Sequence, residues 1–229
     1  MFFWDGTMVL LIPAILLSLY AQFKISAAYK KYSGIRSQSG LTGAQAARAL
    51  LNSNGLYDVR VERIGGRLSD HYDPRTRVIS LSDDVYQSAS LASVAVAAHE
   101  TGHAIQHATE YFPLQLRSSF VPVANLGSGA GPILIMAGLF VPSFDWLLQL
   151  GIFAFAFAVL FQVITLPVEY NASHRALALL QETNVLRSEE VRGARSVLNA
   201  AALTYVAAAL AAVLQLARFI LIARSRNDD

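Results

Sequence analysis

The most specific chemical signal in this sequence is H-E-T-G-H at residues 99–103. Residues four apart on a helix lie on one face, about 5–6 Å apart, so both imidazoles can reach one metal ion. The glutamate between them is then placed to act as general base toward a zinc-activated water. The alternative is an ordinary helix with two solvated histidines. The flanking residues 92–98 and 104–105 are almost all apolar, which argues against it, because burying His and Glu without partners is costly.

A catalytic zinc needs a third protein ligand besides His99 and His103, and one position left open. His107 continues the same face but lies two turns beyond His99, about 12 Å along the helix axis. That is too far to share a metal whose bonds to nitrogen are about 2 Å long. Glu169, which ends a long charge-free run, is the favoured candidate. The residues alone leave rivals open: Asp70, Asp73, His71 and His174.

Composition and the clustering of apolar residues predict a membrane protein. Of 229 residues, 54% are hydrophobic and only 15% are charged. Four charge-free runs are about 18–23 residues long, enough to cross the hydrocarbon core of a bilayer. We expect a retained N-terminal anchor and three further spans. They lie near residues 6–23, 120–141, 146–168 and 198–222.

Charge placement predicts the orientation of these spans. Most of the 18 Lys and Arg follow the first or the third span, so the positive-inside rule places both segments in the cytoplasm. Arg218, Arg224 and Arg226 depart from this pattern, and their side depends on whether the fourth run crosses. The chain has no cysteine, so His and carboxylates must bind any metal. A net charge of +2 argues against a nucleic-acid partner.

Between the first and second spans the sequence predicts a small inserted α+β unit. Residues 43–52 form the expected helix, with Thr42 as its N-cap and Gly55 ending it. Residues 59–64 and 76–81 are the expected strands. The second strand either forms an exposed edge that pairs with an extended substrate or simply pairs with the first.

We expect one helix to open at Ser82, carry the H-E-T-G-H residues and end near Pro113. The fold class is then a mainly α membrane protein with about four transmembrane helices and a zincin-like α+β unit. Residues 1–229 are expected to form a single domain. Its cytoplasmic catalytic unit would comprise residues 42–117 and 169–197.

Three blocks resemble one known family. They are H-E-T-G-H-A-I-Q at residues 99–106, L-S-D-H-Y-D-P at 68–74 and L-P-V-E-Y-N-A-S-H-R-A at 166–176. In this order they are similar to the YugP-like membrane zinc metallopeptidases, over nearly the whole chain. The chain resembles more distantly the HtpX and CAAX prenyl endopeptidases, whose third zinc ligand is the first Glu of an E-x-x-A-D block. The resemblance implies that Glu169 completes the site for one Zn²⁺, with Ser173 in place of the Asp of that block.

These residues predict an integral-membrane zinc endopeptidase. Glu100 would take a proton from the zinc-activated water and pass it to the leaving amine. A further donor should stabilise the oxyanion. The candidates are His174, Arg175, Tyr170 and His71, and we assign the role to His174 and Arg175.

The expected substrate is a membrane-associated polypeptide, and the expected location is the cell membrane, with several spans and a cytoplasmic active site. One alternative is a zinc-holding scaffold or adaptor of a membrane protease complex. The intact Glu100 argues against it, since a scaffold does not need a general base. The other alternative is a metal-dependent hydrolase of non-peptide amides.

Overall fold

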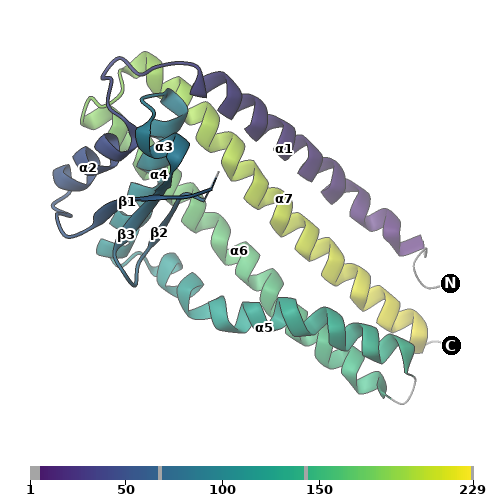
Figure 1. Cartoon of the computed structure of the whole chain (residues 1–229). Coiled ribbons are helices and arrows are strands. Elements are labelled where there is room, and N and C mark those ends of the chain that lie inside the picture. The colour runs from purple at the N-terminus through teal and green to yellow at the C-terminus, as the bar shows by residue number, and fades with distance from the viewer. Residues whose placement is uncertain (1–5, 67–68, 142–143, 228–229) are drawn as a thin grey trace. The chain divides into compact units, whose positions relative to one another are not determined.

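The computed structural model describes residues 6–66, 69–141 and 144–227 (Figure 1). The chain divides into two compact units. We call residues Met1–Ala21, Gln115–Pro167 and Thr204–Asp229 the membrane unit, and Gln22–Leu114 with Val168–Leu203 the sheet unit. Leu68, from one of the three sequence blocks, and Pro142 and Ser143, between the second and third expected spans, lie outside the described residues.

Among the described residues, four helical segments are long and apolar enough to cross a membrane, which confirms the expected fold class. Each is longer than the charge-free run predicted for it. The longest run, 146–168, lies in a helix of 38 residues, about 57 Å at 1.5 Å per residue, against about 30 Å of hydrocarbon. The helices therefore continue beyond their apolar parts. They are η1 (Gly6–Leu11) with α1 (Ile12–Ser33), α5 (Phe112–Phe140), α6 (Asp145–Glu182) and α7 (Ser188–Asn227).

Within the membrane unit, α5 and α6 run side by side, and glycines allow their backbones to approach (Figure 1). A Cβ on Gly131 would lie 3.2 Å from the Gly151 carbonyl oxygen. Arg226, near the end of α7, donates to the Gly138 carbonyl and lies 3.8 Å from the Asp145 carboxylate. The C-terminal end of α7 therefore lies at the end of the membrane unit where α5 meets α6.

The described part of the sheet unit contains three strands, β1 (Arg60–Ile64), β2 (His71–Asp73) and β3 (Val78–Ser82), in the order β1-β3-β2. β3 pairs parallel with β1 and antiparallel with β2. Both predicted strands are confirmed within one or two residues. Of the two alternatives for the second strand, pairing with the first is confirmed, and an exposed edge is wrong because β2 pairs with its other side. β2 was missed because it is short and polar.

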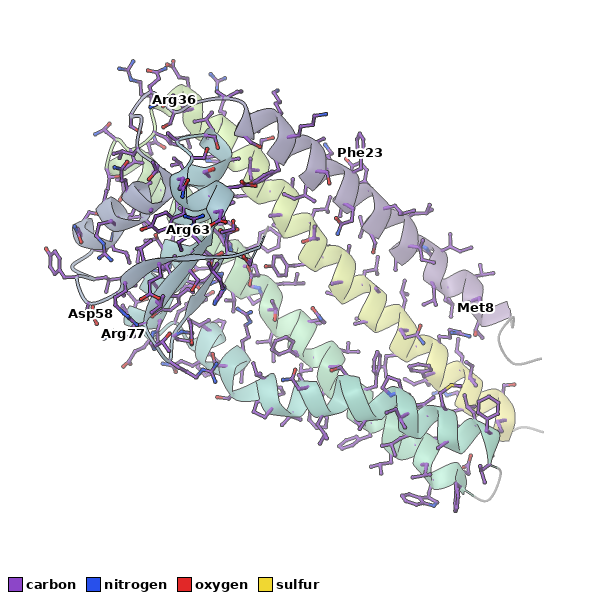
Figure 2. The ribbon with its side chains drawn as sticks, viewed as in Figure 1. Met8, Phe23, Arg36, Asp58, Arg63 and Arg77 are labelled. Carbon is purple, nitrogen blue, oxygen red and sulfur yellow. The ribbon has the colours of Figure 1, made fainter. Side chains whose placement is uncertain are left out.

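Polar contacts fix the chain around these strands. Asp58 and Arg77, in the turns before β1 and β3, form an ion pair (Figure 2). The Asp70 carboxylate accepts hydrogen bonds from the Ser82 backbone N–H and hydroxyl, at 2.7 and 3.0 Å. The strand ends are therefore fixed by short side-chain contacts.

The predicted first helix is confirmed as α2 (Gly43–Ser53). The Thr42 hydroxyl accepts from the Gln45 N–H, and the Gln45 side chain accepts from the Thr42 N–H, which completes a capping box. Gly55 follows the helix with φ +73°, a left-handed conformation that a residue with a Cβ rarely adopts.

The prediction of a single helix from Ser82 to Pro113 is wrong. This segment forms two helices, α3 (Asp83–Gln87) and α4 (Leu91–Ala108). Ser90 caps α4 by accepting from the Ser93 N–H, and the backbone there pairs with residues 35–37 instead of continuing the helix. The H-E-T-G-H residues therefore belong to a separate helix that begins at Leu91, and residues 100–103 of this helix are buried.

The core of the sheet unit surrounds α4, which is buried over most of its length. One cluster packs α4 against α2, α6 and the first turns of α7, and a second packs it against α2, α3 and the sheet. The largest fully buried apolar side chains of these clusters are Leu50, Leu51, Val59, Ile79, Leu81, Val85, Val94, Leu180 and Leu186.

Candidate metal centre

His99 and His103 lie on one face of α4, with ring centroids 4.7 Å apart and ring planes at 84°. Their Nε2 atoms lie 3.2 and 3.6 Å from the same oxygen, Oε2 of Glu169 on α6. Glu169 is 2% exposed. Two imidazoles and a carboxylate distant in the sequence are thus brought together in a largely buried part of the sheet unit.

This arrangement fits a zinc ion. The three potential ligand atoms of His99, His103 and Glu169 lie within 4.8 Å of one another. Ligands at the usual zinc distances in a tetrahedron are about 3.3–3.4 Å apart, close to the two nitrogen–oxygen distances here. Imidazole nitrogens and a carboxylate oxygen are donors that zinc prefers. The residues present therefore suit the metal that the sequence predicts.

Gly102 allows α6 to approach α4 closely enough for this geometry. A Cβ at Gly102 would lie 2.5 Å from the Ala172 carbonyl oxygen and 3.1 Å from the Ala172 Cα. A real Cβ does not sit so close to backbone atoms, so only glycine fits there. Ala172 is three residues after Glu169, so this contact fixes the part of α6 that carries the carboxylate.

Both candidate ligand histidines have an oxygen partner at the other ring nitrogen. His99 Nδ1 lies 3.1 Å from the Ser173 hydroxyl, and His103 Nδ1 lies 3.0 Å from Gln106 Oε1. Such partners orient a ligand imidazole and direct Nε2 at the metal. These two roles are not predicted from the sequence. The available signal in the sequence was helical spacing, since Ser173 follows Glu169 by one turn and Gln106 follows His103 by one turn.

Glu100 is buried, at 8% exposed, beside the two histidines on α4. Burial lowers the pKa of His103, but the carboxylates of Glu169 and Glu100 outweigh this effect and raise its pKa above the usual value. The site therefore carries enough negative charge to favour a cation. Glu100, the expected general base, directly follows His99 and lies three residues before His103 on α4.

The other ligand candidates lie elsewhere in the sheet unit. His107 Nδ1 lies 2.8 Å from the Tyr72 hydroxyl, so His107 joins the end of α4 to β2. His71 is exposed, with Nδ1 2.8 Å from the Ser69 carbonyl oxygen. The Asp73 carboxylate accepts hydrogen bonds from Arg75 and Thr76 in the turn before β3. Asp70 bonds to the end of β3, as described above.

The two residues predicted to stabilise the oxyanion differ in their surroundings. His174 is exposed on α6. Arg175 donates from Nε to Asn171 Oδ1 at 2.8 Å, and its guanidinium lies 5.9 Å from the centre of the Tyr111 ring. Their catalytic role stays a prediction.

Comparison with known proteins identifies the family. Residues 7–224 match the family described as "Putative neutral zinc metallopeptidase". The chain belongs to this family. It is also 48% identical to "Putative membrane protease YugP" of Bacillus subtilis (strain 168) over 220 residues, which cover 96% of this chain and 97% of the relative. No solved structure gives a significant match.

Membership of this zinc metallopeptidase family confirms the resemblance seen in the three sequence blocks. It implies zinc as the metal, which agrees with the donor set of His99, His103 and Glu169. The more distant similarity to HtpX and CAAX prenyl endopeptidases stays a prediction. The four apolar helices, together with the membrane relative, support a location in a membrane.

Proposed function

We propose that this protein is an integral-membrane zinc endopeptidase in which His99, His103 and Glu169 hold one zinc ion and Glu100 is the general base. The observation that carries the proposal is the convergence of both Nε2 atoms on one Glu169 oxygen, 3.2 and 3.6 Å away. Membership of a zinc metallopeptidase family supports the choice of metal.

The residues of the chain divide the chemistry among them. A bound zinc ion would polarise a peptide carbonyl and lower the pKa of a water molecule toward about 7. Glu100 takes the proton of the attacking water and delivers it to the amine that leaves. Ser173 and Gln106 hold the two imidazoles in place. His174 and Arg175 remain the proposed oxyanion donors.

The proposed site lies at the edge of the bilayer on the cytoplasmic side. Glu169 directly follows the charge-free residues 146–168 of α6. The Lys and Arg residues of the sheet unit favour the cytoplasm under the positive-inside rule. A substrate held in or near the membrane would reach such a site, so we propose membrane-associated polypeptides as substrates.

Glu100→Gln tests the mechanism directly. The amide keeps the size of the side chain but cannot accept the proton. The rate of peptide cleavage should therefore fall about 10²–10⁴-fold. Zinc content should stay unchanged, because Glu100 is not a proposed ligand. Both quantities are measured on the purified full-length protein, with peptides and with non-peptide acyl amides as substrates.

Each outcome of that experiment has a definite meaning. Undiminished cleavage by Glu100→Gln would remove the mechanism. Cleavage of acyl amides but of no peptide would favour the non-peptide hydrolase. A wild-type protein that holds zinc and cleaves neither substrate class would favour the scaffold.

A further inference from the structure

Gln106 is the most completely bonded polar side chain near the proposed zinc site. It is fully buried, one turn after His103 on α4, and its Oε1 lies 3.0 Å from His103 Nδ1. Its amide nitrogen donates to α6 twice: to the Val168 carbonyl at 2.8 Å and to Asn171 Oδ1 at 3.0 Å. With its oxygen and its nitrogen both engaged, the carboxamide is fixed in one orientation.

The hydrogen bonds that link Arg175, Asn171, Gln106 and His103 form a connected series. The donor and the acceptor of each bond follow from groups that can only donate or only accept. Arg175 Nε can only donate, so the Asn171 atom 2.8 Å from it is an oxygen. That oxygen and the Val168 carbonyl both require the NH₂ group of Gln106. Gln106 must therefore present its oxygen to His103. The Nδ1 atom of His103 then carries a proton, which leaves Nε2 to bind a metal.

His99 is held differently. Its Nδ1 partner, the Ser173 hydroxyl 3.1 Å away, can either donate or accept. The Ser173 contact alone therefore does not select a tautomer of His99. Only the His103 ring is connected to a chain of bonds with a fixed direction.

We infer that Gln106 is a positioning residue that selects the metal-binding tautomer of His103, with Asn171 and Arg175 holding it in the required orientation. The inference rests on the proposed zinc site. It gives Arg175 a positioning role through Asn171, in addition to the oxyanion contact proposed above. The Tyr111 ring, 5.9 Å from the Arg175 guanidinium, helps to hold that side chain.

Cobalt(II) binding by the purified full-length protein tests this role without catalysis. The visible absorption spectrum of the cobalt reports its ligand geometry, and competition with a chelator gives the affinity. Gln106→Met keeps the volume of the side chain but removes its hydrogen bonds. It should bind cobalt about 10–100-fold more weakly and with an altered spectrum.

Asn171, which is half-buried, provides a second pair of variants whose folding is less at risk. Asn171→Leu removes the acceptor for Gln106 and Arg175, so it should shift affinity and spectrum in the same direction as Gln106→Met. Asn171→Asp keeps an oxygen that accepts from both, so it should restore wild-type behaviour. A merely space-filling role for Asn171 would instead make the two variants alike.

Thr101→Val is the matched control. Thr101 is buried on α4, and its hydroxyl donates within the helix to the Ala97 carbonyl at 2.9 Å, so its loss should change neither readout. Wild-type affinity and spectrum in both Gln106→Met and Asn171→Leu would overturn the positioning role but leave the zinc site standing. A wild-type protein that binds no cobalt would overturn the proposed function, and this inference with it.

Discussion

At the residue scale, the two proposed histidine ligands differ in the strength of the partner that orients them. Gln106 is fixed on both sides, whereas Ser173 offers His99 a single hydroxyl. A hydroxyl is a weaker partner for a ligand imidazole than a carboxylate. Substitutions at Ser173 can therefore either remove the partner of His99 Nδ1 or replace it with a stronger one.

Ser173→Ala should weaken zinc binding about 10–100-fold, because it removes the oxygen at His99 Nδ1. Ser173→Asp, which supplies the carboxylate of the E-x-x-A-D block, should bind zinc at least as tightly as the wild type. Chelator competition measures both affinities. Ser188→Ala, at an exposed position on α7, is the control. Equal zinc affinity in Ser173→Ala and the wild type would show that the hydroxyl does not support the site.

Local spacing explains which of these residues could be predicted. His99 and His103 were predicted because four residues on a helix bring two side chains to one face. The candidate Glu169 followed from the end of a charge-free run and from the resemblance. Ser173 and Gln106 could not be assigned, because a serine or glutamine one turn from a ligand is common and only the packing of α4 against α6 gives it a role.

At the scale of elements, the site depends on the approach of α6 to α4 in the sheet unit. That approach occurs where Gly102 faces the backbone of Ala172. A methyl group there would have to displace backbone atoms of α6, because no flexible side chain can move aside. The two residues between Glu169 and Ala172 would transmit the displacement to the carboxylate.

Gly102→Ala should therefore destabilise the fold by about 1–3 kcal/mol, as overpacking does, and weaken zinc binding as well. Gly129→Ala is the matched control, because a Cβ at that helical glycine meets nothing within 4 Å. It should be neutral or stabilising. Thermal unfolding and zinc titration of the two variants make the comparison. A Gly102→Ala protein with wild-type stability and zinc affinity would refute the close-packing argument.

Element types were predictable where the pattern is local, and their arrangement was not. Alternation in residues 59–64 and 76–81 indicated two strands, but the order β1-β3-β2 depends on a three-residue polar strand that resembles a loop. The break between α3 and α4 arises from pairing of residues 89–91 with the distant segment 35–37. Neither long-range contact is visible in periodicity.

At the scale of the whole molecule, apolar runs predicted the four candidate spans but not the full lengths of their helices. The helices continue into polar sequence because tertiary packing, as in the core around α4, stabilises the added turns. The membrane unit also places the end of α7 beside Gly138 and Asp145. Arg226 therefore lies near the start of α6, where Asp145 offsets part of its charge.

The predicted orientation can be tested with single introduced thiols, since the chain has no cysteine. Phe144→Cys and Arg224→Cys should react with a membrane-impermeant maleimide in intact cells. Asn54→Cys, exposed after α2, should react only after the membrane is opened. Labelling of Asn54→Cys in intact cells would place the sheet unit outside and contradict the cytoplasmic assignment.

The measurement that tests the central claim most directly is the zinc content of the purified full-length protein, wild type against Glu169→Ala. Glu189→Ala, which removes an exposed carboxylate on α7, is the control. We predict one zinc per chain in the wild type and in Glu189→Ala, and a large loss in Glu169→Ala. A Glu169→Ala protein that keeps one tightly bound zinc per chain would contradict the account.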